Sequence, residues 1–376
     1  MIKFIVSSQL LAKNLHHVNG ILTTNKSVPI VENILFVIEN SSLTLIGTDL
    51  ETTITTKVEL SESDGDGSIV IPGKLIVETI SSLPDVPVIF TVNDDYSIEV
   101  SAGEAFYKLM GFDAEQFPQV KEVEDEQTFK MPVDVLVNGI SRTAFATGNA
   151  EIRPVMAGIF CQLSPEGITF VATDAHRLVK YHNNTVKIDK EAALIIPKKP
   201  LLQLKNILQN TDETMEVSFS ESRIRFTLNT ITVTTKLIEG KYPNYEAVIP
   251  KNNTNVLQVE RQNLLQKIRN ITLYANQSTY QVRLKIEDTK LTLTAEDIDY
   301  STKATVNLPC VFEGEESEFE IGFSSKFLQE ILSNLMTKDV VFKFSHPTGA
   351  GLVFEMKDQP DEEDVLMLIM PLMLNN

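Results

Sequence analysis

The stretch "FVATDAHRLVKY" at residues 170–181 places Asp174, His176 and Arg177 within four positions at the end of an apolar run. Such a set suggests nucleophilic or acid–base chemistry, in which a nucleophile, a histidine and an orienting acid converge within hydrogen-bond reach. Alternation along a strand would put Asp174 and His176 on the same face. This stretch is therefore the first place to look for catalysis.

The other parts of such a site are missing from the sequence. No serine stands in a G-x-S-x-G elbow, and there is no H-E-x-x-H zinc motif, P-loop or G-x-G-x-x-G fingerprint. The five histidines lack metal-ligand spacing. We therefore predict no catalytic residue, no metal and no cofactor, and interpret Asp174 as a side chain that accepts hydrogen bonds from the backbone amides of a turn.

Length and composition limit the class of protein. A chain of 376 residues with 43% hydrophobic residues can bury a core in each of two or three domains. Cys161 and Cys310 form no C-x-x-C pair, which suits a reducing compartment without disulfides. No apolar stretch approaches the ~18 residues of a membrane span, and the N-terminus lacks the features of a signal peptide. We expect a cytoplasmic protein that does not bind membranes.

An internal repeat organises the chain. Three segments each give a short apolar run, a break and a helical pattern: "KFIVSSQLLAKNL" (3–15), "TFKMPVDVLVNGI" (128–140) and "VLQVERQNLLQKI" (256–268). Further along each copy, "LTLIGTDLETTI", "ITFVATDAHRLV" and "LTLTAEDIDYST" align so that Asp49, Asp174 and Asp297 coincide. A second amphipathic helix and alternating strands then complete each copy.

Each copy thus combines two helices with mostly antiparallel strands, which is an α+β arrangement. Charged or turn-forming residues interrupt the periodicity in "QVKEVEDEQ" (119–127) and "PKNNTN" (250–255). We predict three domains, at residues 1–125, 126–251 and 252–376.

The charge is divided unevenly between the predicted elements. A net charge of −18 argues, taken alone, against a nucleic-acid partner. The six predicted helices, however, contain ten basic and four acidic residues, a net charge of +6, so the rest of the chain carries −24. These helices are expected at 7–22, 73–82, 132–147, 197–209, 260–275 and 324–335. A basic face on an acidic body can still bind DNA, because the local field governs contact.

Lys74, Lys199 and Lys326 occupy equivalent places near the start of the second helix in each copy. The helix dipole disfavours a cation there. One explanation is that lysine is simply a good former of exposed helices. Three equivalent positions, together with the charge segregation, favour a polyanion that faces the helices.

Some segments depart from the repeat and are candidates for a function that one copy alone performs. His176, Arg177 and Leu178 occur only in the second copy, and "KYPNYEAVIP" (241–250) joins copies two and three. In the tail "DVLMLIMPLMLNN" (364–376), we expect the last strand to end at Met370. The methionine-containing apolar end suits a promiscuous pocket, although it could also simply cap a core.

At this point the chain resembles a known family, the bacterial sliding clamps, which are the beta subunits of the replicative DNA polymerase III. The resemblance covers the whole chain and rests on "MIKFIVSSQLLAKNL" (1–15), "GTDLE" (47–51), "VATDAHRL" (171–178), "KYPNY" (241–245) and "MPLML" (370–374). It implies a non-catalytic homodimer, closed head to tail into a ring of six similar units, with helices lining the hole and sheets forming the outer wall. Such a ring slides on double-stranded DNA without sequence preference and tethers the polymerase.

The resemblance also implies two sets of site residues. Short peptide motifs of the polymerase catalytic subunit, the clamp loader and repair proteins would enter a pocket made of Met156, Thr173, His176, Arg177, Leu178, Pro243, Tyr245, Val248, Met370, Pro371, Leu372 and Met373. The residues implied to contact DNA are Lys26, Lys74, Arg153, Lys198 and Lys199.

The sequence departs from the family pattern at the rim of this pocket. Glu246 and Ala247 stand where an arginine is common, and the tail reads "MPLML" followed by Asn375 and Asn376 where "MPMRL" is frequent. Both changes remove positive charge, so we expect the preferred peptides to be less acidic. The alternative to the whole interpretation is an acidic repeat scaffold that does not encircle DNA.

Overall fold

The computed structural model describes residues 1–120, 126–208, 213–314, 318–356 and 362–374. The chain divides into two compact units, one formed by Met1–Leu136 with Lys199–Leu237 and the other by Val137–Lys198 with Ile238–Asn376. The predicted domain boundary after residue 125 adjoins residues 121–125, which lie outside the described residues, as do Asn375 and Asn376.

The first unit contains two antiparallel sheets, with strand orders β5-β1-β7-β8-β9 and β10-β15-β16-β17-β4-β3-β2-β6. Their strands are β1 (Ile2–Ser7), β2 (Asn33–Glu39), β3 (Ser42–Thr48), β4 (Thr52–Glu59), β5 (Glu62–Asp64), β6 (Gly67–Pro72), β7 (Pro87–Val92), β8 (Ser97–Ala102), β9 (Ala105–Met110), β10 (Gln127–Pro132), β15 (Thr214–Phe219), β16 (Arg223–Leu228) and β17 (Ile231–Lys236).

The second unit also contains two antiparallel sheets, with orders β14-β11-β12-β13-β26-β25-β24-β18-β22 and β21-β20-β19-β23. Their strands are β11 (Gly158–Ser164), β12 (Gly167–Thr173), β13 (Arg177–Asn183), β14 (Ala192–Pro197), β18 (Asn255–Glu260), β19 (Gln281–Glu287), β20 (Lys290–Asp297), β21 (Thr302–Pro309), β22 (Val311–Glu313), β23 (Glu318–Ser324), β24 (Asp339–Phe344), β25 (Gly351–Glu355) and β26 (Glu363–Ile369).

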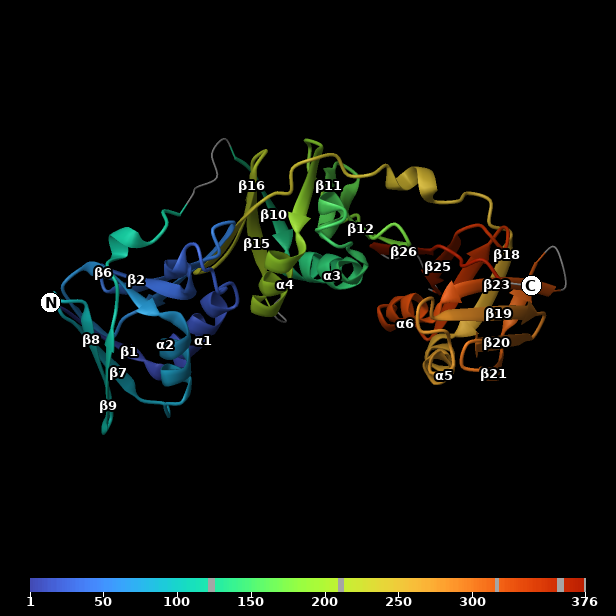
Figure 1. Cartoon of the computed structure of the whole chain (residues 1–376). Coiled ribbons are helices and arrows are strands. Elements are labelled where there is room, and N and C mark those ends of the chain that lie inside the picture. The colour runs from blue at the N-terminus through green and yellow to red at the C-terminus, as the bar shows by residue number, and fades with distance from the viewer. Residues whose placement is uncertain (121–125, 209–212, 315–317, 357–361, 375–376) are drawn as a thin grey trace. The chain divides into compact units, whose positions relative to one another are not determined.

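Six α-helices of the described residues lie where the sequence predicts them. They are α1 (Ser8–Asn19), α2 (Gly73–Ser81), α3 (Val133–Thr143), α4 (Lys198–Ile207), α5 (Arg261–Thr272) and α6 (Ser325–Ser333). The apolar stripe of α1 includes Leu11, Leu15 and Val18, which are fully buried. Helix α1 packs against α2, and α5 packs against α6 (Figure 1). The predicted α+β class is confirmed.

Neighbouring copies of the repeat are joined by strand pairing within each unit. In the first unit β4 pairs with β17, and in the second unit β13 pairs with β26. In both cases the fourth strand of one copy meets the last strand of the next. Their counterparts are β21, the fourth strand of the third copy, and β9, the last strand of the first copy, and each of these lies at one end of its sheet.

The strand register agrees with the alignment of Asp49, Asp174 and Asp297. The preceding hairpins close at Glu39 with Ser42, Ser164 with Gly167, and Glu287 with Lys290, and each Asp stands seven residues after the second member of its pair. Each also accepts hydrogen bonds from the amides two and three residues further on. The strand of the third copy extends one pair further than the others, to Asp297 with Thr302.

No helix among the described residues combines the length and the hydrophobicity that crossing a membrane would require.

Candidate functional site

The turn between β12 and β13 is fixed by Asp174 and Thr173. Asp174 Oδ1 accepts hydrogen bonds from the backbone amides of His176 and Arg177, both at 2.9 Å. Thr173 Oγ1 donates to the Arg177 carbonyl at 2.7 Å and accepts from the Ala175 amide at 3.1 Å. Ala175 has a φ of 75°, which this tight turn requires. The structural interpretation of Asp174 is confirmed, and its contacts orient the backbone that presents His176.

Arg177 is buried, and each nitrogen of its guanidinium group donates a hydrogen bond. Its Nε donates to Asp174 Oδ2 at 3.1 Å, its Nη1 donates to Glu330 Oε2, and its Nη2 donates to the Phe145 carbonyl at 2.9 Å. The guanidinium carbon lies 5.2 Å from the ring centre of Phe145 and 4.7 Å from that of Phe327. Because these contacts compensate the buried charge, Arg177 fastens the turn to α6.

The His176 side chain is exposed. Its imidazole lies 6.0 Å from the Phe327 ring, with 23° between the ring planes. Its backbone oxygen accepts a hydrogen bond from the Met370 amide at 2.8 Å. The turn, α6 and the C-terminal segment therefore meet around His176.

Phe327 and Glu330 belong to this group although the sequence interpretation missed them. The signal that could have found Phe327 is its place in the repeat. It follows Lys326, whereas Leu75 and Pro200 follow the equivalent lysines, so an aromatic residue occurs there in the third copy only. This is the same kind of departure that identified His176.

Leu178 and Tyr245 lie in a core cluster under the same turn. Their buried neighbours in this cluster are Val171, Ile195, Tyr242, Leu352 and Leu368. Tyr242 stacks on Phe160 with ring centres 4.6 Å apart. Burial raises the pKa of the Tyr245 phenol to about 12, so this side chain stays neutral. The cluster therefore offers an apolar surface on which the side chains of a ligand could pack.

The twelve residues of the expected peptide pocket divide by exposure. Four are exposed, namely His176, Val248, Met370 and Met373; four are half-buried, namely Met156, Pro243, Pro371 and Leu372; and four are buried, namely Thr173, Arg177, Leu178 and Tyr245. A side chain at Gly148 would lie 3.3 Å from Met156 Cβ and 3.6 Å from Asp174 Cα, so this glycine lets Met156 approach the turn. All twelve belong to the second unit.

The C-terminal segment leaves this group after Met370. Strand β26 ends at Ile369, one residue earlier than predicted. The Leu372 amide donates to the Gly322 carbonyl at 2.8 Å, and Gln281 Nε2 donates to the Met373 carbonyl at 3.1 Å. The structure thus joins Met370 to His176 but places Leu372 and Met373 along β23 and β19.

The five residues expected to contact DNA differ in availability. Lys26 and Arg153 are exposed, and the Lys74 side chain is 88% exposed. Lys199 is half-exposed and lies 3.3 Å from Asp49 Oδ2. Burial, together with the nearby Arg177 charge, lowers the pKa of Lys198. Lys26, Lys74 and Arg153 are therefore the cations most open to a polyanion.

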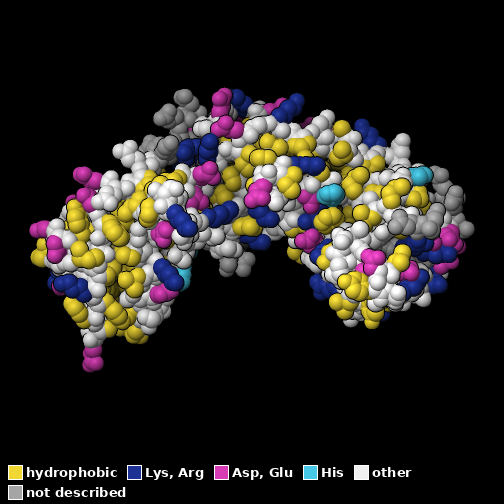
Figure 2. Space-filling view, viewed as in Figure 1, with side chains coloured by type: hydrophobic (Ala, Val, Ile, Leu, Met, Phe, Trp, Pro, Cys, Tyr) yellow, Lys and Arg dark blue, Asp and Glu magenta, His cyan; other side chains and the backbone are white. Residues whose placement is uncertain are grey.

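The helices of the structure keep the predicted excess of basic residues, but two of these basic side chains point into the protein. The observed helix bounds contain ten basic and three acidic residues. Arg142 pairs with Glu355 at 2.8 Å, and Arg261 donates to the Thr337 and Leu332 carbonyls. On the face seen in Figure 2, basic and acidic side chains lie beside one another. The positive field must therefore come from individual exposed cations.

Within the described ranges, no group of three or more His, Cys, Asp or Glu side chains is placed to hold a metal ion. The geometry around His176 instead offers an apolar base, an imidazole beside an aromatic ring and flexible methionines, which suits binding of an apolar peptide.

Comparison with known protein families gives three consecutive matches. Residues 2–121 match the N-terminal domain of the DNA polymerase III beta subunit, residues 130–244 its central domain, and residues 246–373 its C-terminal domain.

Individual relatives match over nearly full length. A beta sliding clamp from Haemophilus influenzae is 27% identical, with 99% of this chain and all of that protein covered. A beta sliding clamp from Bacillus subtilis is 26% identical, covering 98% of this chain and 99% of the relative.

Solved structures share the fold. The DNA polymerase III subunit beta of Pseudomonas aeruginosa superimposes with a TM-score of 0.92 at 27% identity, covering 99% of this chain and 100% of that one. The sliding clamp of Bacillus subtilis gives a TM-score of 0.93 at 23% identity over the full length of both chains, and at this identity it supports the fold alone.

Proposed function

Since this chain belongs to the DNA polymerase III beta subunit family, the bacterial sliding clamps, we propose that it encircles duplex DNA and tethers the replicative polymerase to it. The observation that carries this proposal is the succession of three clamp domains across residues 2–373. The protein is a non-catalytic processivity factor. The alternative of a scaffold that does not encircle DNA has no comparable support.

Two copies would close the ring through β21 and β9, the counterparts of the strands that join neighbouring copies. Strands β4 and β13 each pair with the last strand of the next copy, so β21 is free to pair with β9 of a second chain. Such a head-to-tail contact closes when its rotation completes a circle. Two chains, with three copies each, would then give the six units that the family resemblance implies.

Exposed apolar side chains beside these two strands support this closure. On β9, Phe106 is 61% exposed and Met110 is 58% exposed. Beside β21, Leu273 is 80% exposed, and the carbonyl of Tyr274 accepts a hydrogen bond from Thr302 Oγ1 at 3.5 Å. Burial of these side chains in a dimer would add apolar stabilisation to the backbone pairing.

The ring would hold DNA by enclosing it and through contacts between a few cationic side chains and the phosphates. Lys26, Lys74 and Arg153 are exposed, with contributions from Lys199 and Lys198. Phosphate contacts carry no sequence information, so the ring would slide without preference for a sequence.

The group around His176 would bind the partner proteins. Apolar side chains of a short peptide would pack between His176, Val248 and Met370, above the cluster that contains Leu178 and Tyr245. Each buried apolar anchor would contribute about 1.5–3 kcal/mol. We add Phe327 to this proposed pocket because its ring lies 6.0 Å from that of His176.

The topological part of the proposal is tested by retention on DNA. The chain is loaded onto nicked circular DNA by the clamp loader of the same genome and then separated by gel filtration. We expect retention on the circle and loss once the DNA is linearised. Equal loss from circular and linear DNA would show that the chain does not encircle it.

The pocket is tested with griselimycin, which is bound to the sliding clamp in a solved structure from Pseudomonas aeruginosa. Calorimetric titration of the wild-type chain and of His176→Ala should show binding that this substitution weakens at least tenfold. Leu75→Ala, which shortens a 50% exposed side chain in the first unit, is the control. Equal affinity in all three proteins would refute the assignment of His176.

A further inference from the structure

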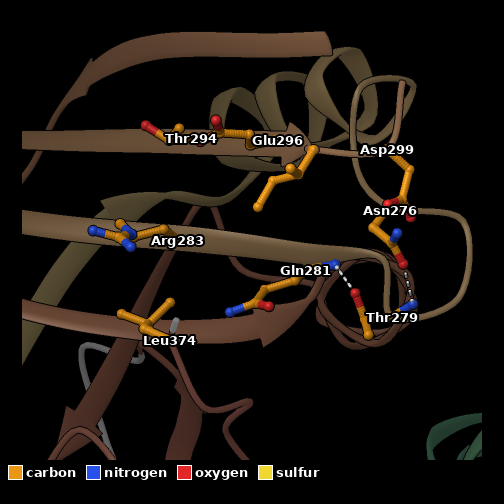
Figure 3. A pocket seen from close by; sticks show the side chains of 9 residues that line it. Asn276, Thr279, Gln281, Arg283, Thr294, Glu296, Asp299 and Leu374 are labelled. Carbon is orange, nitrogen blue, oxygen red and sulfur yellow. Dashed lines mark hydrogen bonds between the residues drawn. The ribbon is translucent and has the colours of Figure 1, made fainter. Parts of the chain in front are cut away.

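A cavity of about 350 Å³ lies in the third copy, away from the group around His176. Gln281 and Arg283 of β19, with Thr294 and Glu296 of β20, line one side of it. These residues alternate with the buried Val282, Leu284, Leu293 and Ala295, so they lie on the sheet face opposite the core. Figure 3 shows their side chains on adjacent strands, with Leu374 facing them from the C-terminal segment.

Gly322 lets the C-terminal segment form a wall of this cavity. A Cβ atom at Gly322 would lie 2.7 Å from Leu374 Cδ2 and 2.8 Å from the Leu372 carbonyl oxygen, both too close for a real side chain. With glycine there, the segment can lie against β23, and Gln281 holds it through the Met373 carbonyl. The same segment begins at Met370, which is bonded to His176. The five residues Met370–Leu374 therefore link the proposed peptide pocket to the wall of this cavity.

The charges around the cavity leave an excess of carboxylate. Arg283 lies 3.3 Å from Glu320, and Glu296 lies 3.0 Å from Lys303, so each of these charges already has an opposite neighbour. Asp299 adds a further exposed carboxylate to the lining. The field in the cavity consequently favours a cation.

The apolar part of the lining suits a long aliphatic stem. Ile298, which is 78% exposed, and Leu374 both line the cavity. Lysine and arginine side chains bury their methylene groups against such surfaces while their charged ends stay hydrated. At about 350 Å³ the cavity is near the lower end of the ~300–1,000 Å³ of small-ligand sites, which is sufficient for one such side chain.

We propose that this cavity is a second contact for partner peptides, in which a lysine or arginine flanking the segment at His176 packs on Ile298 and Leu374 and points its charge at Asp299. This inference rests on the proposed peptide pocket and adds a specificity to it. The backbone from Met370 to Leu374 spans at most about 13 Å at ~3.3 Å per residue. An extended flank of about four to six residues would therefore reach the cavity.

The test first identifies a core peptide. The sequence of the polymerase catalytic subunit from the same genome is divided into overlapping peptides, and each is tested for binding to the full-length chain. The shortest segment that binds is the core peptide. Glycine–serine flanks of six residues are then added at either end. One flank position at a time carries lysine, glutamate or serine. Affinities are measured by fluorescence anisotropy at low salt.

We expect lysine at one flank position to tighten binding about three- to fivefold relative to serine, and glutamate to weaken it. The Asp299→Asn/Glu296→Gln double variant should abolish this difference while its affinity for the core peptide stays unchanged. Glu287→Gln/Glu318→Gln is the matched control, because it removes the same charge from the same sheet face outside the cavity lining. A chain ending at Leu374 controls for any effect of the last two residues.

Two results would overturn the inference while the pocket stands: equal affinity for lysine, serine and glutamate flanks at every position, or equal loss of the lysine effect in both double variants. If no tiled segment binds the wild-type chain, the peptide pocket itself fails, and this inference fails with it.

Discussion

Arg177 and Glu330, 153 residues apart in the sequence, are joined by a hydrogen-bonded ion pair that fastens the β12–β13 turn of the second copy to helix α6 of the third. The Arg177 side chain is 7% exposed and that of Glu330 is 49% exposed. The buried Arg177 therefore depends on this partner more than the half-exposed Glu330 does, because water can hydrate the Glu330 carboxylate. The wall of the proposed pocket that carries His176 is held in place by this link.

Replacing Arg177 with methionine should lower the free energy of unfolding by about 3 kcal/mol, because Asp174 and the Phe145 carbonyl would lose their buried partner. Glu330→Gln should cost less than about 1 kcal/mol, since this side chain is half-exposed and glutamine still accepts a hydrogen bond. Urea denaturation of both variants measures the difference. Similar costs would show that Arg177 is not the principal anchor.

Leu273→Asp should convert the dimer into a monomer. The charge would be placed beside β21, where the proposed contact buries an apolar side chain, and an unpaired buried charge is strongly unfavourable. Light scattering should give about 84 kDa, twice the chain mass of 42.0 kDa, for the wild type and 42.0 kDa for the variant. Ile152→Asp, at another exposed apolar position, should remain dimeric. A monomeric wild type at micromolar concentration would refute the closure through β9 and β21.

Neutralising exposed cations should weaken the salt dependence of DNA binding. For Lys26→Gln/Lys74→Gln/Lys199→Gln, we expect the slope of log K against log salt to fall by about 2–3, because each phosphate contact contributes about 0.9. Lys57→Gln/Lys285→Gln/Lys290→Gln makes the same charge change on strands and should leave the slope unaltered. Equal slopes for the two triple variants would mean that net charge alone governs binding.

Stability should fall on mild acidification through His17. Burial, followed by the charges of Lys13 and His16, lowers the pKa of His17 below its ordinary 6.5. The unfolded chain then binds a proton at a higher pH than the folded chain does. The contribution of neutral His17 is therefore fully present above pH 6.5 and is lost as the pH falls toward the folded-state pKa. The melting temperature of His17→Gln should drop less between pH 7.5 and 5.5 than that of the wild type.

The control for this pH effect is His346→Gln, which alters an exposed turn histidine and should keep the wild-type pH dependence. An identical drop in His17→Gln and in the wild type would place the acid sensitivity elsewhere.

Both thiols should be inert in the folded chain. Burial raises the pKa of Cys161 to about 12 and that of Cys310 to about 11, so neither forms a reactive thiolate at pH 8. A colorimetric disulfide reagent should detect no thiol in the native protein and two after denaturation. Rapid reaction of the native protein would contradict the burial of these residues.

Much of the fold was predictable because it depends on local patterns. The stripe of Leu11, Leu15 and Val18 and its counterparts in the other copies have the helical period, which any segment shows independently of its partners. The match between copies then predicted three α+β repeats. The departures at His176 and in the tail were also visible in the sequence, and the folded chain joins them through the Met370 amide and the His176 oxygen.

Other features depended on partners distant in the sequence. The count of helix cations included Arg142, which the fold turns inward to Glu355. Phe327 was missed because its neighbour His176 is 151 positions away, so only the folded chain brings the two rings together.

The sequence by itself determined the helices, the threefold repeat and the residue types available for binding, because periodicity and composition act within short stretches of chain. Only the tertiary structure decided that β26 pairs with β13, that Arg177 is occupied by Glu330, and that Gly322 admits Leu374 over the sheet. The physical reason is that strand edges and buried charges take whichever partner the packed fold brings within reach, and no local pattern specifies that partner.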